Sequence, residues 1–194
     1  MAAAFFVRAE VSEGVSGLGQ KKTQILEAAS MTRSMSRMAH EILEKNKGLA
    51  NLTLVGIQTR GAFLAERIAD KLLEIEGVRP EVFHLNARPY RDDLPTFQGI
   101  RPPVPGLDVQ DKIIVLVDDV LYTGRTIRAA MDAVMATGRA RMVQLAVLVD
   151  RGHRELPIRP DFVGKNVPTA KDETISVLVK EVDNEDGIWI VNRS

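Results

Sequence analysis

The sequence predicts an α/β protein with a doubly wound, mainly parallel sheet flanked by helices, and two observations support this. Short aliphatic runs alternate with segments whose apolar residues recur at helical spacing. The runs at 113–117 and 144–149 are almost wholly aliphatic, which is typical of strands buried on both faces of a parallel sheet. At 194 residues, the chain has the length of one ordinary domain.

The individual elements follow from these patterns. Strands are predicted at residues 52–57, 82–85, 113–117 and 144–149, with helices through 31–42, 64–75 and 127–134. Gly48 and Gly77 are placed to end the first two helices. After Asp150 we expect a polar loop and then a C-terminal antiparallel hairpin, 175–182 with 187–191, appended to the sheet. The apolar residues of 88–111 show neither helical nor strand spacing, so we expect a long loop there. Long loops in compact domains are usually functional or disordered.

Residues 1–22 show no sustained spacing of apolar residues, so we expect a loosely ordered N-terminal extension there, followed by a single domain over 23–194. The formal charge is zero, so an RNA partner would have to be met by a local basic patch. The absence of cysteine excludes disulfides and thiolate sites, and no apolar run is long enough to span a membrane, so we expect a cytoplasmic protein. The methionines of 31–42 suit either a homodimer interface or an internal core.

One segment carries the clearest chemical signal. Asp118 and Asp119 follow an aliphatic strand, and ligands of open α/β sheets bind beyond the C-terminal ends of strands. Adjacent carboxylates suit the vicinal hydroxyls of a sugar. Thr123, Gly124 and Thr126 then open a helix, where free N–H groups and hydroxyls can hold a phosphate. The simpler alternative, a strand end followed by a helix cap, would be preferred for an isolated Asp-Asp pair.

The run 115–126 (VLVDDVLYTGRT) resembles the motif by which type I phosphoribosyltransferases bind 5-phosphoribosyl-1-pyrophosphate (PRPP). The resemblance implies that fold, with a small hood over the substrate, and a Mg²⁺ cofactor that accompanies PRPP. It implies that Thr59, Arg60 and Gly61, after the first strand, bind pyrophosphate. In the long loop, Arg91 would contact the leaving pyrophosphate. Asp92 and Asp93 would position the Mg²⁺ ion. The substrate-binding segment after the two catalytic acids comprises Val120, Leu121, Tyr122, Thr123, Gly124, Arg125 and Thr126.

Further motifs resemble the PyrR family, the bifunctional pyrimidine operon attenuation proteins with uracil phosphoribosyltransferase activity. They are RMAHEI at 37–42, YRDDL at 90–94, LVDRGHRELP at 148–157 and FVGKNVP at 162–168. The resemblance implies conversion of uracil and PRPP to UMP and pyrophosphate, and binding of pyrimidine-operon leader RNA in the presence of UMP or UTP. Purine enzymes usually carry an acid where this chain has Tyr122, and the hood residues Arg151 and Ile175 would hold uracil.

The same resemblance implies a basic RNA surface formed by Arg37, His40, His153, Arg154, Arg159 and Lys165. A solvated charged face is the alternative that composition alone would favour. The chain departs from the family where Asp-Ile-Thr usually stands, because residues 86–89 read Asn-Ala-Arg-Pro, which puts loop closure in doubt. Two other functions therefore stay open: an RNA-binding regulator with weak or lost activity, and a phosphoribosyltransferase for another base. A homodimer or a higher homo-oligomer is expected.

Overall fold

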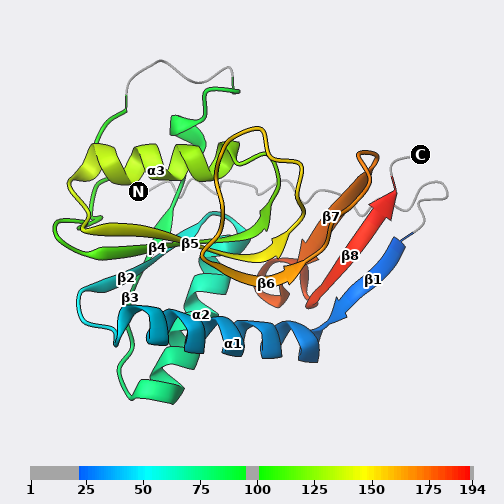
Figure 1. Cartoon of the computed structure of the whole chain (residues 1–194), viewed down its shortest axis with the longest axis horizontal. Helices are drawn as coiled ribbons and strands as arrows, with labels where there is room; N and C mark the ends of the chain where they lie inside the picture. Colours follow the sequence, from blue (N-terminus) through cyan, green and yellow to red (C-terminus); the bar gives the residue numbers. More distant parts are fainter. Residues whose placement is uncertain (1–21, 95–100, 193–194) are drawn as a thin grey trace, which may run out of the picture.

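The structure, a computed structural model, describes residues 22–94 and 101–192, and within them the strands form two sheets (Figure 1). The larger sheet has five parallel strands in the order β3-β2-β4-β5-β6. This confirms the doubly wound, mainly parallel sheet predicted from the sequence. Its strands are β2 (Leu52–Ile57), β3 (Glu81–Leu85), β4 (Ile113–Leu121), β5 (Met142–Asp150) and β6 (Phe162–Asn166).

Helices cover both faces of this sheet (Figure 1). Helices α1 (Ala28–Asn46) and α2 (Arg60–Glu76) lie on one face, and α3 (Arg125–Thr137) lies on the other. Each contains one of the three predicted helical segments. Gly77 ends α2 in the left-handed region, with φ of 74°, and donates its N–H to the Leu73 carbonyl, as the sequence predicted for a terminating glycine.

Strand β4 contributes side chains to the hydrophobic cores on both faces of the parallel sheet, because alternate side chains of a strand point to opposite faces. Ile113, Val115 and Val117 face α1 and α2, while Ile114 and Leu116 face α3. The aliphatic run predicted from sequence is therefore a strand buried on both sides.

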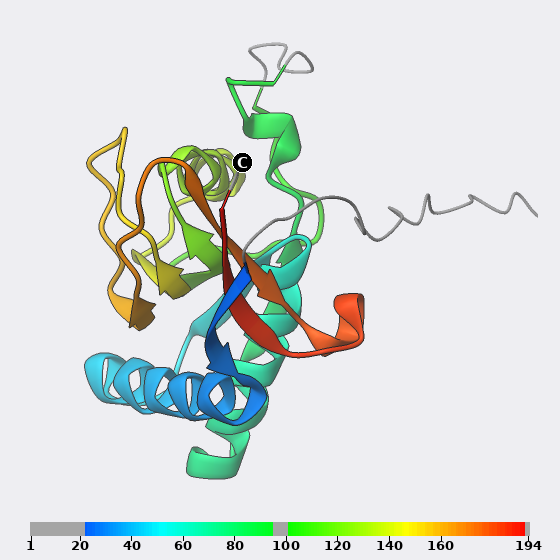
Figure 2. The same cartoon turned by 90° about the vertical axis from the view of Figure 1, so that its right-hand side faces the viewer.

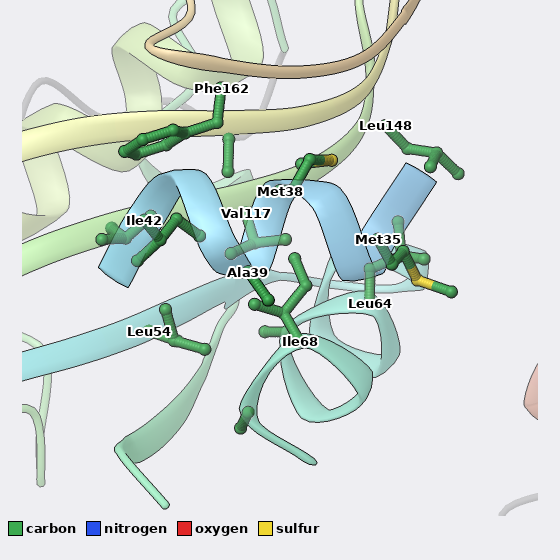
Figure 3. Packing of buried hydrophobic residues seen from close by; sticks show 14 of the residues in the cluster. Met35, Met38, Ala39, Ile42, Leu54, Leu64, Ile68, Val117, Leu148 and Phe162 are labelled. Carbon is green, nitrogen blue, oxygen red and sulfur yellow. The ribbon is translucent and has the colours of Figure 1, made fainter. Parts of the chain in front are cut away.

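The methionines of α1 belong to the internal core. Met31, Met35 and Met38 are buried, and Figure 3 shows Met35 and Met38 packed among side chains of α2, β5 and β6. Burying each such side chain contributes about 1.5–3 kcal/mol. Of the two alternatives left open by the sequence, the internal core accounts for these residues.

The smaller sheet contains three antiparallel strands in the order β1-β8-β7 (Figure 2). They are β1 (Lys22–Glu27), β7 (Glu173–Leu178) and β8 (Gly187–Asn192), and the short helix α4 (Lys180–Asp183) joins β7 to β8. The predicted hairpin is thus confirmed as an antiparallel pair, but its placement was wrong. It forms a separate sheet with β1 instead of extending the parallel one. Of the predicted extension, residues 1–21 lie outside the described part of the chain, and Lys22 begins β1.

Two strands were not predicted, β1 and β6, and β6 lies where we expected a polar loop. It carries little apolar pattern because it is the edge strand of the sheet, with Lys165 and Asn166 exposed. Gly164 lets its backbone approach β5, since a Cβ there would lie 2.5 Å from the Leu148 carbonyl oxygen. This segment becomes a strand because it pairs with β5. Such pairing cannot be predicted from the spacing of apolar residues in the segment itself.

The loop predicted at 88–111 is confirmed in its described parts, apart from the single 3₁₀ turn η1 (Arg88–Tyr90). Residues 95–100 of that loop lie outside the described ranges. No helix within 22–94 and 101–192 combines the length and the apolar character needed to cross a membrane.

Candidate active site

A cavity of about 280 Å³ opens at the carboxyl ends of β2 and β4. The chain leaves β2 toward β3 and leaves β4 toward β5, so the order of the strands reverses between these two neighbours. Such a reversal leaves a crevice between the diverging loops, which is where open α/β sheets bind ligands. The cavity is lined by Ile57, Gln58, Thr59, Arg60, Ala87, Arg88, Arg91, Asp118, Asp119, Val120 and Thr126.

Asp118 and Asp119 lie near the C-terminal end of β4 and line this cavity. Asp118 is buried, and its Oδ1 accepts the N–H of Asp119 at 3.0 Å. Oδ1 of Asp119 accepts the N–H of Val120 at 2.8 Å. Burial, and then the negative charge of Asp119, raise the pKa of Asp118 well above its ordinary value. The carboxyl oxygens not used by the backbone are acceptors for hydroxyl groups of a ligand.

The turn that the sequence predicts to bind phosphate lies at the start of α3. Gly124 has φ of 92°, a left-handed conformation that favours glycine, and α3 begins at the next residue. A second cavity of about 170 Å³ lies over this turn, and Arg91, Val120 and Thr126 line both cavities. A ligand can therefore reach from the two acids to the N–H groups of the helix start. The remaining lining residues are Leu121, Tyr122, Thr123, Gly124 and Ile127.

The loop between β2 and α2 forms the opposite wall. A Cβ on Gly61 would lie 2.5 Å from the Val117 carbonyl oxygen and 3.0 Å from Cα of Asp118. Glycine is therefore required for this loop to approach β4. Arg60 lines the cavity, and its guanidinium is held by Asp183 of α4 through bonds of 2.9 Å from Nε and 2.7 Å from Nη2.

Arg91 joins the long loop to the cavity. Its Nη1 donates to Oγ1 of Thr126 at 2.8 Å, while Nε and Nη2 bind the Asp93 carboxylate at 2.8 and 2.5 Å. Asp92 lies 2.9 Å from Nη2 of Arg128. The structure thus brings Arg91 to the site as predicted, and it pairs both acids with arginines.

The unusual stretch 86–89 leads into a well-anchored turn. Oδ1 of Asn86 accepts the N–H of Arg88 at 3.1 Å, and the ring of Tyr90 is buried with its hydroxyl donating to the Pro102 carbonyl. Ala87 and Arg88 both line the main cavity. The departure from the family pattern therefore places a cationic side chain at the site.

The acids at the site fit a Mg²⁺ ion that also binds substrate phosphates and water. Within the described ranges, no three His, Asp or Glu side chains cluster as a metal site. Mg²⁺ is commonly held by one or two carboxylates, substrate phosphates and water, and the Asp118–Asp119 pair fits that pattern. Asp92 and Asp93 stay predictions as metal-positioning residues.

The predicted hood lies beyond the end of β4. The Arg151 guanidinium stacks on the Tyr122 ring at 3.9 Å from its centre, donates to Oγ1 of Thr169 at 2.8 Å and also donates to the Glu173 carbonyl. The His153 ring also meets the Tyr122 ring edge-on, with ring centres 6.2 Å apart. Ile175 is buried in the core instead of lining either cavity.

The predicted RNA-binding residues lie in two groups. On α1, Arg37 reaches β6 by donating to the carbonyls of Val163 and Gly164, beside the exposed Lys165, and His40 follows one turn later. In the hood, His153 and Arg159 are exposed. The Arg154 guanidinium is paired with Asp150 at 2.5 Å and donates to the Ile158 carbonyl at 3.0 Å, so it helps to hold the hood loop together.

Sequence reasoning missed several residues of the cavity wall. Ala87 and Arg88 line the cavity, and their place after the parallel strand β3 was a usable signal. Gln58, which the sequence placed in the same candidate loop as residues 59–61, lines the cavity as well. Asp183, which holds Arg60, had no such signal, because it lies in α4, between two strands of the other sheet, and reaches Arg60 only through the tertiary fold.

Comparison with known proteins agrees with this geometry. Residues 21–181 match the phosphoribosyl transferase domain. "Bifunctional protein PyrR" of Ligilactobacillus salivarius is 55% identical over 170 residues, covering 85% of this chain and 96% of the relative. The protein of the same name from Clostridium acetobutylicum is 54% identical over 172 residues, covering 87% and 97%.

Solved structures show the same fold at low sequence identity. The hypoxanthine-guanine phosphoribosyltransferase (HGPRT-ase) of Leishmania tarentolae in complex with GMP has a TM-score of 0.66 at 17% identity, covering 89% of this chain and 98% of that one. Hypoxanthine phosphoribosyltransferase of Trypanosoma cruzi with the product IMP has a TM-score of 0.64 at 16% identity, covering 88% and 89%. The fold, the site at the strand reversal and these identities together show that the chain belongs to the phosphoribosyl transferase domain family and, within it, to the PyrR family.

Proposed function

We propose that this protein is a uracil phosphoribosyltransferase that converts uracil and PRPP to UMP and pyrophosphate, and that it also regulates pyrimidine genes by binding leader RNA. The observation that carries the enzymatic proposal is the continuity of the two cavities. They run from the Asp118–Asp119 pair to the α3 helix start and share Arg91, Val120 and Thr126. This layout suits a sugar bearing phosphates at two positions.

Different residues of the site bind different parts of PRPP. Asp118 and Asp119 accept hydrogen bonds from the ribose hydroxyls, and residues 123–126 hold the 5′-phosphate with backbone N–H groups and threonine hydroxyls. Arg91 and residues 59–61 bind the pyrophosphate. When bound, Mg²⁺ neutralises charge on the leaving pyrophosphate. Catalysis then rests on positioning and on electrostatic stabilisation of a positively charged sugar centre.

The uracil assignment rests on the region around Tyr122. A purine enzyme usually places an acid at that position, and here the aromatic ring of Tyr122 is in contact with Arg151 and meets His153 edge-on. We propose that uracil lies against this part of the hood. Hydrogen bonds to Thr169 and to the Glu173 carbonyl fix the position of the Arg151 guanidinium there. A panel of uracil, hypoxanthine, guanine and orotate tests the assignment, and preferential turnover of another base would overturn it.

The enzymatic proposal is tested by measuring UMP formation from uracil and PRPP with Mg²⁺. The variant Asp118→Asn/Asp119→Asn should lose at least about 10²-fold in kcat/KM, because charged acceptors at the ribose are replaced by neutral ones. Asp70→Asn, an exposed acid on α2 that pairs with Arg79, is the matched control and should retain native turnover. Native turnover in the double variant would contradict the ribose assignment.

The regulatory proposal is supported by family membership and by exposed cationic residues of α1 and β6, where Arg37 donates to the Gly164 carbonyl and the exposed Lys165 is the next residue along β6. Binding to a pyrimidine-operon leader RNA should be tightened by UMP and weakened by salt, as phosphate contacts require. Arg37→Ala/Lys165→Ala should reduce the salt dependence without changing uracil turnover. Turnover without RNA binding by the native chain would leave the enzyme as the only function. RNA binding without turnover would instead favour the regulator with lost activity.

A further inference from the structure

Arg60 is held by a carboxylate from α4, the short helix that joins two strands of the small sheet. Nε and Nη2 of Arg60 donate to the two oxygens of Asp183 at 2.9 and 2.7 Å, in a forked ion pair. Side-chain exposure is 34% for Arg60 and 16% for Asp183, so the pair is partly shielded from water. A forked, partly buried pair fixes the plane of the guanidinium more firmly than a single bond does.

Asp183 is itself fixed by the turn in which it lies. Its Oδ2 also accepts the N–H of Val179 at 2.8 Å, which closes the one-turn helix α4 onto the end of β7. The hydrogen bond from Arg60 lowers the pKa of Asp183, so this carboxyl is charged at neutral pH. The small sheet thus presents a rigid anion to the wall of the main cavity.

A second carboxylate, that of Asp119, also attracts the same guanidinium. Arg60 and Asp119 line one cavity, and the hydrogen bond to Asp183, with the negative charges of Asp183 and Asp119, raises the pKa of Arg60. A guanidinium released from Asp183 would be drawn to Asp119. Pairing there would occupy the oxygen acceptors that the proposed function assigns to a ribose hydroxyl.

We propose that Asp183 is a positioning residue, which holds the Arg60 guanidinium away from Asp119 and so keeps that carboxylate free for the sugar. The fork uses Nε and Nη2, which leaves Nη1 of Arg60 to donate to an anionic substrate. The inference rests on the proposed phosphoribosyl transfer and adds to it a residue outside the PRPP-binding segment. It also gives the small sheet a direct role at the site.

A neighbouring ion pair provides a matched control. Arg67, two turns further along α2, binds Glu181 of α4 at 2.5 Å and Asp186 at 2.8 Å. It joins the same two parts of the molecule, but neither Arg67 nor Glu181 lines a cavity at the site. If Asp183 only fastened α4 to α2, then Glu181→Gln would have the same effect on turnover as Asp183→Asn.

The test is a double-mutant cycle on kcat/KM for PRPP, with uracil turnover as the assay. Asp183→Asn keeps an acceptor for Val179 but loses the charge, so kcat/KM for PRPP should fall about tenfold, within the range of coupling in charged pairs. KM for uracil should stay near native. In the Arg60→Ala background the same substitution should have no further effect, and Asp183→Glu should restore part of the loss. Glu181→Gln should leave kcat/KM unchanged.

The outcomes separate this inference from the function on which it rests. Equal losses from Asp183→Asn in the native and Arg60→Ala backgrounds would overturn the positioning role, as would native kcat/KM in Asp183→Asn. Loss of turnover in Glu181→Gln as well would assign the effect to docking of α4. Failure of the native chain to turn over uracil would instead overturn the proposed function, and this inference with it.

Discussion

Asp118 shows at the level of one residue how a site can reduce the stability of its own fold. Its carboxyl group is buried beside a second acid, and both features raise its pKa. The folded chain therefore binds this proton more tightly than the unfolded chain does. Such a group favours the folded state fully below its unfolded pKa of about 3.9 and loses that contribution as the pH rises through the folded pKa.

Asp118→Asn should therefore raise the melting temperature at neutral pH while it removes turnover. The amide is neutral at every pH, so the advantage over the native chain should vanish below about pH 4, where the native acid is protonated in both states. Melting curves between about pH 3 and about pH 8 measure this difference. The exposed Asp70→Asn should show no such gain. A lower melting temperature for Asp118→Asn at neutral pH would contradict the argument.

At the level of elements, α2 links the helical layer of the parallel sheet to the turn between β7 and β8 through ion pairs. Arg67 binds Glu181 and Asp186, and its hydrogen bonds help to lower the pKa of both acids. A carboxyl group with a lowered folded pKa stabilises the fold above its unfolded pKa. That stability is lost as the pH falls through the folded value.

Arg67→Ala should cost about 2 kcal/mol in the free energy of unfolding at neutral pH, because two partly buried carboxylates lose a charged partner. The difference from the native chain should shrink on acidification below about pH 4, where the acids become protonated. Urea unfolding at the two pH values measures it. Lys71→Ala removes an exposed pair within the same helix and should cost only about 0.3 kcal/mol. Equal costs for the two variants would contradict a linking role for Arg67.

At the level of the whole molecule, the N-terminal strand completes the small sheet. Lys22, Thr23 and Gln24 pair with residues of β8, whose other edge pairs with β7. The small sheet in turn buries Ile188 and Val177 against α1. Removal of β1 would leave β8 with an unpaired edge, which favours aggregation.

A chain that begins at residue 22 should keep the melting temperature and turnover of the full chain, whereas one that begins at residue 28 should melt earlier and aggregate. This pair of truncations also tests the predicted division into an extension over 1–22 and a single domain over 23–194. Light scattering during thermal unfolding reports the aggregation. Loss of activity on removing residues 1–21 alone would show that the extension contributes to the domain.

The sequence by itself determined the parallel sheet, its helices and the segment around Asp118, because periodicity and motif spacing are local properties of the chain. The assignment of Arg91 and residues 59–61 came from the resemblance to type I phosphoribosyltransferases, and Thr59, Arg60 and Arg91 line one cavity in the structure. The edge strand β6, the separate small sheet and the contact between Asp183 and Arg60 were decided only by the tertiary structure. Each depends on contacts between segments that are far apart in sequence. Such contacts cannot be predicted from the spacing of apolar residues within either segment.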